Sequence, residues 1–282
     1  MDCSWRESGP VYKRQNYFNM NIILNADDFG FDEDTLESTI YCFEQNALTS
    51  ATIMPTMPLT YKALDYAGNN PQYSYGVHLT YIDALKPLSK ASEIKSLVNS
   101  SGLFMPSNVV RIKSMFYLLN KTQIIEETKR QIGLLLDHNI PVSHVDSHGH
   151  IHKYPVFSEA LRVVLRDLGI TRVRKVQDVF VRPDGESAKR KFIHSINSRF
   201  AGFIQSNYTT TDYFYMPASR LDTAWTPRLM KLINRLGSDK TMEIGIHPGS
   251  VEVWRKNELN EAVRFCSFLK KTRHRLINWN DI

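Results

Sequence analysis

Short apolar runs alternate with stretches of helical periodicity along most of this chain of 282 residues. The first run, residues 21–26, predicts a buried strand. Residues 36–47 then repeat with the spacing of one helix face, and Asp32 or Asp34 stands where a capping side chain is expected. The same pattern predicts further strands at residues 48–54, 75–79, 142–146, 171–176, 242–247 and 276–279, and further helices at residues 59–67, 122–138, 155–168, 226–237 and 257–269.

This repeated order of strand and helix indicates an α/β protein with a parallel sheet, either open or closed into a barrel. Residues 83–107 are less regular and are expected to form an insertion. Residues 1–19 have no period of either kind, and Met20 opens the first strand. We therefore expect residues 1–19 to be a non-native or disordered leader and residues 20–282 to form one domain.

Composition excludes several classes of protein. Hydrophobic residues make up 42% and charged residues 23%, a balance typical of a globular domain. No run of about 20 apolar residues is present, so no membrane span is expected. The three cysteines, Cys3, Cys42 and Cys266, form no Cys-x-x-Cys pair and suit neither a disulfide framework nor a cysteine zinc site. With no apolar signal core before Asn21, a cytoplasmic location is predicted.

The net charge of +6 comes partly from basic clusters at residues 162–191 and 270–275. No nucleic-acid motif accompanies these clusters. We interpret them as solvated helix faces and expect no nucleic-acid partner.

Carboxylates and histidines follow several of the predicted strands at the point where each strand ends. Asp27 and Asp28 follow the first strand, and His78, His148 and His247 fall at or just after the ends of three others. In a β/α barrel the carboxyl ends of the strands form the face that holds the active site. One aspartate and two histidines would make a site with open positions, suited to Zn²⁺, Fe²⁺, Co²⁺ or Mn²⁺.

The adjacent pair Asp27 and Asp28 has two interpretations. Neighbouring carboxylates repel each other unless a cation or a helix N-terminus lies near them. A metal would take one as a ligand and leave the other free as a base. Alternatively, Asp28 caps the following helix and Asp27 is solvated.

A histidine-rich run covers residues 144–152. While the chain stays extended, its even-numbered residues share one face, which would align four histidines and Asp146. Such a row must line water or hold a metal, because burying it without partners would cost several kcal/mol. A chance histidine-rich loop is the alternative.

Together these segments resemble the YdjC family of carbohydrate deacetylases. The segments 25–30, 76–79, 144–152 and 247–249 occur in the order seen in that family, and the resemblance runs from Met20 to the C-terminus. It implies a single (β/α) barrel, TIM-like but irregular, with its active site at the carboxyl ends of the strands. It also implies an N-acetylated oligosaccharide of the chitooligosaccharide type as substrate, and a homodimer.

By the same resemblance, Asp28, His78 and His148 hold one divalent metal ion, Asp27 is the catalytic base and His247 the general acid. The family implies Mg²⁺, whereas the ligand set also suits Zn²⁺ or Co²⁺. Gly149 stands where some members have a third histidine, which leaves substrate contacts in that loop open.

Three more residues are candidates for supporting roles or substrate contacts. Asp146 is expected to orient a histidine. Arg174 either holds Asp27 ionised, contacts substrate or is a surface arginine, and His150 lies in the same loop as His148. Aromatic residues at positions 208, 213–215 and 225 either form a sugar platform or seal the flank of the barrel.

Other functions fit parts of the pattern. Two histidines and one aspartate also describe non-haem iron oxygenases, although an adjacent free Asp27 and a histidine acid favour hydrolysis. A metal-dependent phosphoesterase uses similar chemistry. A non-catalytic barrel that binds a sugar is the third alternative, because fold does not imply function.

Overall fold

The structure, a computed structural model, describes residues 19–180, 200–217 and 224–282. The predicted leader at residues 1–19 therefore lies outside the described residues, apart from Asn19. Among the described residues, none of the helices combines the length and apolar character needed to cross a membrane.

A parallel sheet forms the centre of the fold. Its strands follow the order β4-β3-β2-β1-β6-β5, with the short β7 paired to β1, and each of these pairs is parallel. The strands are β1 (Met20–Phe29), β2 (Ser50–Ile53), β3 (Ser74–Leu79), β4 (Val142–Ser147), β5 (Tyr213–Tyr215), β6 (Lys240–Ile246) and β7 (Arg275–Leu276).

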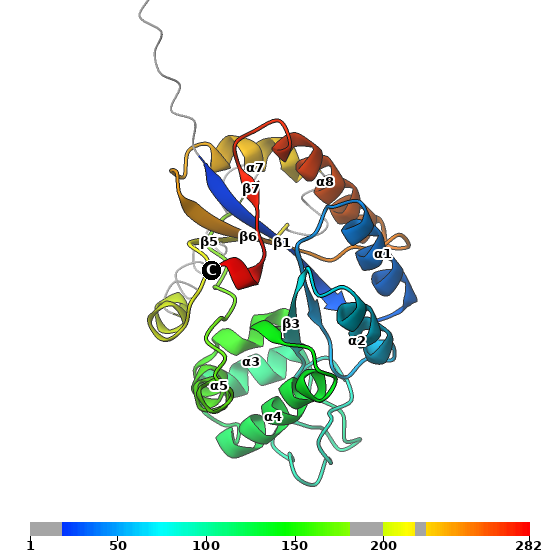
Figure 1. Cartoon of the computed structure of the whole chain (residues 1–282). Helices are drawn as coiled ribbons and strands as arrows, with labels where there is room; N and C mark the ends of the chain where they lie inside the picture. Colours follow the sequence, from blue (N-terminus) through cyan, green and yellow to red (C-terminus); the bar gives the residue numbers. More distant parts are fainter. Residues whose placement is uncertain (1–18, 181–199, 218–223) are drawn as a thin grey trace, which may run out of the picture.

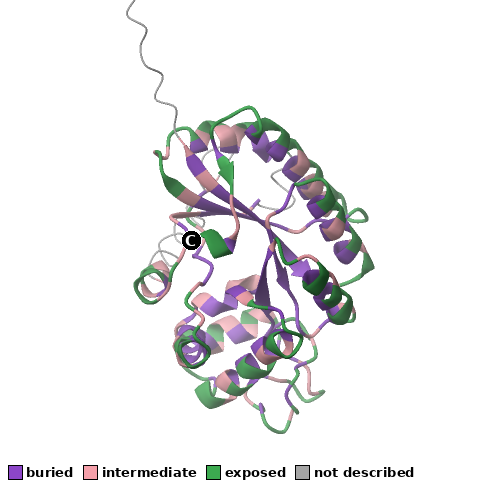
Figure 2. Ribbon diagram, viewed as in Figure 1, coloured by how far each residue is buried: buried purple, intermediate pink, exposed green. Residues whose placement is uncertain are grey.

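Helices surround the strands, as Figure 1 shows. Those described over their whole length are α1 (Glu33–Glu44), α2 (Thr60–Asn69), α3 (Ser107–Met115), α4 (Lys121–Asp137), α5 (Pro155–Leu168), α7 (Trp225–Ile233) and α8 (Val253–Leu269), with the 3₁₀ turns η1 (His148–Lys153) and η2 (Trp279–Asp281). In Figure 2 the central strands are mostly buried, whereas β7 and the outer faces of the helices are exposed. This burial on both faces explains why the first strand reads as a continuous apolar run.

The sheet curls until its two edges are joined by one irregular segment. The predicted strand at residues 171–176 makes only isolated parallel bridges, Val173 with Val145 of β4 and Arg172 with Thr209. Val179 then bridges Tyr215 of β5. Because the segment changes partners after each short pairing, no continuous ladder forms. The expectation of an irregular (β/α) barrel is confirmed.

Several elements differ from their predicted bounds. The last helix begins at Val253 and not at the predicted cap Asn257, and its inner face carries two buried acids, Glu258 and Glu261. The predicted strand at residues 276–279 shortens to β7 and a 3₁₀ turn that buries Trp279 completely. Helix α3 was not predicted, and it follows directly after the irregular residues 83–106.

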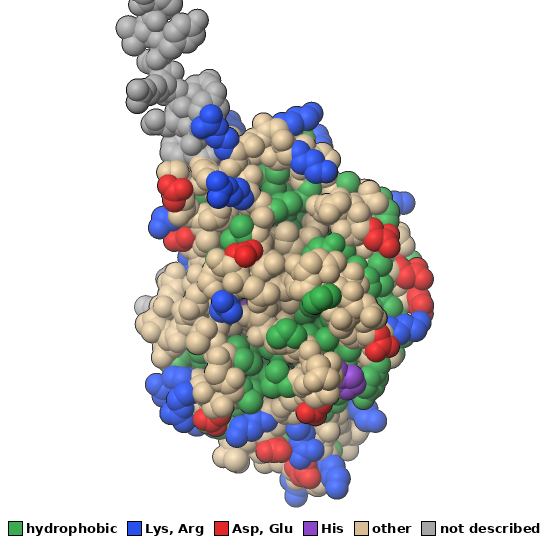
Figure 3. All heavy atoms as spheres, viewed as in Figure 1, with side chains coloured by type: hydrophobic (Ala, Val, Ile, Leu, Met, Phe, Trp, Pro, Cys, Tyr) green, Lys and Arg blue, Asp and Glu red, His purple; other side chains and the backbone are tan. Residues whose placement is uncertain are grey.

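Charged side chains of both signs occur around the edge of the face seen in Figure 3. Basic and acidic groups lie beside one another there. Exposed ion pairs of the protein include Lys62 with Glu33 (3.3 Å) and Arg130 with Glu93 (3.1 Å). Pairs as exposed as these contribute little to stability.

Candidate active site

Asp27 and Asp28 reach the same end of the barrel because β1 is irregular there. Successive side chains of a regular strand point to opposite faces. Asp28, however, has a φ of 61°, and the register between β1 and β2 shifts between Ala26 and Phe29. This bulge turns both carboxylates toward the site. The cap of α1 is Asp32, whose Oδ1 accepts a 2.8 Å hydrogen bond from Thr35 N, so the interpretation of Asp28 as that cap is wrong.

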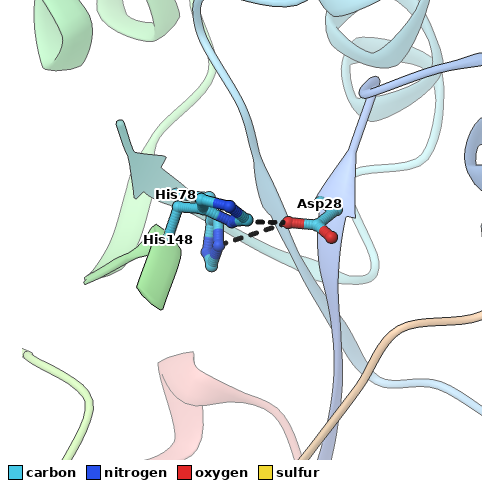
Figure 4. A group of neighbouring side chains, drawn as sticks. All are labelled: Asp28, His78 and His148. Atoms are coloured by element: carbon cyan, nitrogen blue, oxygen red, sulfur yellow. Dashed lines mark ion pairs between the residues drawn. The ribbon is translucent and has the colours of Figure 1, made fainter. Parts of the chain in front are cut away.

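Asp28 meets two histidines from neighbouring strands. Its Oδ1 lies 3.4 Å from His78 Nε2 and 3.3 Å from His148 Nδ1, as Figure 4 shows. His78 comes from β3, and His148 follows the last residue of β4. The side chains of Asp28 and His78 are almost completely buried, whereas 27% of His148 is exposed. His148 therefore lies on the open side of the group.

Asp146 fixes the orientation of His78. The Nδ1 atom of His78 lies 2.8 Å from Asp146 Oδ1, within hydrogen-bonding distance, while Nε2 faces Asp28. A histidine that donates one ring N–H to a carboxylate presents the lone pair of its other nitrogen to a metal. Thr52 Oγ1 donates to the second oxygen of Asp146 at 3.3 Å. His78 is thus held in the tautomer that a metal ligand requires.

Asp27 is paired with Arg174, which comes from the irregular segment that joins β4 to β5. The guanidinium donates from Nη1 to Asp27 Oδ2 at 2.6 Å and from Nη2 to Asp27 Oδ1 at 2.7 Å. Asn25 Nδ2 adds a 2.9 Å hydrogen bond. Burial would raise the pKa of Asp27, but Arg174 and two nearby histidines outweigh it and hold this pKa well below its usual range.

Arg174 is not a surface residue, because its side chain is completely buried. It also contacts Asp146 and donates to Glu243 Oε1 from Nε at 2.8 Å and from Nη2 at 2.7 Å. One guanidinium therefore forms ion pairs with three buried carboxylates. Among the interpretations of Arg174, its geometry matches the one in which it keeps Asp27 ionised.

His247 follows β6 and approaches Asp27 from the other side. Its Nε2 lies 4.0 Å from Asp27 Oδ2, and its Nδ1 lies 3.2 Å from Glu258 Oε2. The backbone N–H of His247 also donates to that Glu258 oxygen at 2.7 Å. Burial disfavours the imidazolium, but Glu258 and the two aspartates outweigh it and raise the pKa of His247 to about 9.

The histidine-rich run does not form the predicted row beyond Ser147. The strand ends there, and Gly149 and His150 take positive φ values of 61° and 55° within η1. Of the even-numbered residues, Asp146 and His148 reach the group around Asp28. The alignment of all four histidines was wrong because it required the extended chain to continue.

The remaining histidines of this run have other neighbours. His144 stacks on Trp279 with ring centroids 4.3 Å apart. The ring of His150 lies 5.9 Å from that of Phe214, and His152 Nδ1 lies 2.7 Å from Ser147 Oγ. His150 therefore lies close to the site without facing Asp28.

Two residues of α8 were missed in the sequence. Glu258 orients His247, and Arg255 Nη2 lies 3.0 Å from Asp28 Oδ2. Arg255 thereby binds one oxygen of Asp28 and leaves the other directed at the histidines. Glu258 could have been noticed as an acidic residue on the buried face of a helix. Arg255 precedes the predicted helix start, and nothing in the sequence pattern marks it as a site residue.

The group of Asp28, His78 and His148 fits a divalent metal. Each offers one ligand atom, and these atoms lie within 4.8 Å of one another. Asp28 Oδ1 is buried and has no well-aligned hydrogen-bond partner among the described residues. One carboxylate oxygen and two imidazole nitrogens are the donors that Zn²⁺, Fe²⁺ and Co²⁺ accept.

An irregular parallel barrel with carboxylates and histidines gathered at the carboxyl ends of its strands has the arrangement of a (β/α)-barrel enzyme. The chain belongs to the YdjC-like protein family, whose family model matches residues 21–275. The family predicted from the sequence motifs is therefore confirmed.

Alignments with two related proteins cover most of the chain. A carbohydrate deacetylase from Clostridium beijerinckii is 25% identical over 275 residues, which cover 93% of this chain and 100% of that protein. One from Geobacillus stearothermophilus is 25% identical over 238 residues, covering 82% and 80%. A crystal structure from Enterococcus faecalis V583, provisionally described as a cellobiose-phosphate cleavage protein, has the same fold, with a TM-score of 0.75 at 20% identity over 93% of this chain and 98% of that one.

Proposed function

We propose that this protein hydrolyses the acetamide of an N-acetylated oligosaccharide of the chitooligosaccharide type, releasing acetate with the help of one divalent metal. One observation carries the proposal: an ionised Asp27 and a protonatable His247 lie 4.0 Å apart beside Asp28, His78 and His148. Amide hydrolysis needs a group that accepts a proton from water and another that donates one to the leaving amine. The names of the relatives supply the carbohydrate substrate.

Asp28, His78 and His148 would hold the metal, Mg²⁺ by family resemblance, with Zn²⁺ or Co²⁺ favoured by the two imidazoles. When bound, such an ion polarises a carbonyl and lowers the pKa of a coordinated water. Asp146 keeps the ring of His78 in place. Arg255 holds the second oxygen of Asp28.

Asp27 would act as the base. Arg174 keeps it ionised at neutral pH, so it is ready to accept a proton from the attacking water. His247, charged below about pH 9, would then donate its proton to the nitrogen of the sugar as the bond to the acetyl carbon breaks. The water oxygen remains with the acetyl group, so the products are acetate and a free amine.

The proton donor and acceptor favour hydrolysis over the oxygen chemistry of non-haem iron enzymes. The single domain at residues 20–282, the cytoplasmic location and the homodimer are proposals supported by the sequence and the family resemblance.

Acetate release from N,N′-diacetylchitobiose tests the reaction class, with p-nitrophenyl phosphate as the competing substrate. We expect acetate from the sugar and no phosphate above the rate of a metal-only blank. Phosphate release without acetate would establish the phosphoesterase alternative. Stoichiometric sugar binding with no product of either kind would establish the non-catalytic barrel.

Metal binding is testable without turnover. Zn²⁺ or Co²⁺ at about 100 times its Kd is expected to raise the Tm of metal-free protein by about 5–10 °C, since ligand binding stabilises the folded state. His148→Ala should lose most of this rise, because it removes one ligand from a partly exposed turn. His150→Ala, in the same turn, is the matched control and should keep it. An equal rise in His148→Ala and wild type would contradict the assignment.

The role of Glu258 predicts a change in pH dependence. His247 donates only while protonated, so activity should fall as the pH rises through its pKa of about 9. Glu258→Gln removes the charge that raises this pKa, and the alkaline limb of kcat/KM should move down by about 1–2 pH units. Glu261→Gln, three residues further along α8 and bonded to Thr226, should leave the limb unchanged. An unmoved limb in Glu258→Gln would exclude His247 as the acid.

A further inference from the structure

An aromatic ring stands at the edge of the site, beside the proposed acid. Trp254 lies in the first turn of α8, and its ring centroid is 5.6 Å from that of His247 at an interplanar angle of 65°. The residue is only partly buried. By contrast, two aromatics considered from the sequence, Tyr215 and Trp225, are fully buried and therefore not available to a sugar.

The chain that carries Trp254 is held in place from two directions. Asp34 Oδ1 accepts hydrogen bonds from Ser250 N and Oγ at 2.7 and 2.5 Å, and Asp34 Oδ2 accepts one from Val251 N at 3.2 Å. The guanidinium carbon of Arg255 lies 4.7 Å from the centroid of the Trp254 ring, while its Nη2 reaches Asp28. The ring is therefore fixed relative to the site before any ligand binds, which lowers the cost of binding.

Two exposed apolar side chains precede Trp254 in the chain. Val251 and Val253, which both precede it in the sequence, are 79% and 76% exposed. Exposed apolar groups beside a cluster of polar side chains are typical of a ligand-binding surface. A pyranose ring has an apolar face of C–H groups and a polar rim of hydroxyls, so it can pack on an indole while its hydroxyls stay in water.

The position next to His247 identifies which sugar ring this would be. In the proposed reaction the leaving nitrogen must come within reach of His247, so the sugar that bears the acetyl group lies beside His247. A ring linked to that sugar would extend outward past His247. Trp254 is the partly buried aromatic residue that packs directly against His247 there.

We propose that Trp254 forms a subsite for a second sugar ring of the substrate, linked to the ring that is deacetylated. This inference rests on the proposed function and narrows it. Trp254 determines the preference of the site for such oligosaccharides over a monosaccharide.

The test compares kcat/KM for acetate release from N,N′,N″-triacetylchitotriose and from N-acetylglucosamine. Wild-type protein should prefer the trisaccharide at least tenfold. Trp254→Ala should abolish most of this preference by raising KM for the trisaccharide, and Trp254→Phe should restore part of it. Phe268→Ala is the matched control: this aromatic, 42% exposed, lies in the last turn of the same helix with Arg264 5.9 Å from its ring. The control should keep the wild-type preference.

Calorimetric titration of triacetylchitotriose into Asp27→Asn protein, with and without Trp254→Ala, measures the subsite without turnover. A Kd about tenfold weaker in the double variant is expected. Active wild type with an unchanged preference and Kd after Trp254→Ala would overturn the subsite alone. Binding that depends on Trp254 without acetate release from wild type would overturn the deacetylase proposal and retain the subsite. Neither binding nor release would overturn both.

Discussion

Asp27→Asn is expected to lower kcat for acetate release by about 10²–10⁴, the usual contribution of a positioned general base. Asparagine has nearly the same shape, and its oxygen can still accept from Arg174, but it cannot accept a proton from water. Arg174 keeps Asp146 and Glu243 as partners, so the fold should persist. KM should change little, because Asp27 is buried behind the group that would hold the metal.

Steady-state kinetics and a metal titration of the variant decide this prediction. Asp27→Asn should bind metal with a Kd close to that of wild type, because Asp27 is not among the proposed ligands. A kcat above one tenth of the wild-type value would contradict its role as base. Loss of metal binding together with activity would instead make Asp27 a ligand.

Arg174→Leu is expected to destabilise the protein by about 3–5 kcal/mol, because it leaves buried carboxylates without their counter-charge. Asp27, Asp146 and Glu243 all lose the same partner. The effect depends on pH with a defined sign. Arg174 depresses the pKa of Asp27, so its stabilisation is present above the ordinary carboxyl pKa and is lost as the pH falls through the lower folded-state value. The difference between variant and wild type should therefore be largest near neutral pH and shrink in acid.

Urea unfolding of metal-free protein at pH 7 and at about pH 2.5, below the ordinary carboxyl pKa, measures this difference. Arg174→Lys keeps the charge but not the two-pronged contact with Asp27, and should fall between wild type and Arg174→Leu. Arg166→Met, whose side chain is 78% exposed on α5, is the control and should change stability by less than about 0.5 kcal/mol. If Arg174→Leu unfolds at the same urea concentration as wild type at both pH values, the buried cluster does not depend on this charge.

Much of the site was visible in the sequence because of how parallel sheets are built. A buried strand shows as an apolar run, and the polar residue that ends the run must lie at the carboxyl edge. That rule placed His78 and His148 near Asp28 although they lie 50 and 120 positions along the chain from it, and the structure brings these three side chains together. The family motifs then supplied roles that spacing alone left open.

The parts that could not be predicted depend on local backbone turns or on contacts between distant segments. No pattern in the sequence predicts the positive φ of Asp28, which directs the side chains of Asp27 and Asp28 toward the same site. The prediction of four aligned histidines was wrong beyond Ser147, because periodicity does not show where a strand ends and a 3₁₀ turn begins. Arg174 binds Glu243, 69 positions away, and a single sequence carries no sign of such a pairing.

The central claim is that a divalent metal and Asp27 together deacetylate a sugar at this site. Its most direct test is acetate release from N,N′-diacetylchitobiose by metal-stripped wild-type and Asp28→Ala protein, before and after adding Mg²⁺, Zn²⁺, Co²⁺ or Mn²⁺. The account predicts no release without metal, recovery in wild type with at least one of these ions, and no recovery in Asp28→Ala. Full activity of the stripped wild type, or equal recovery in Asp28→Ala, would contradict it.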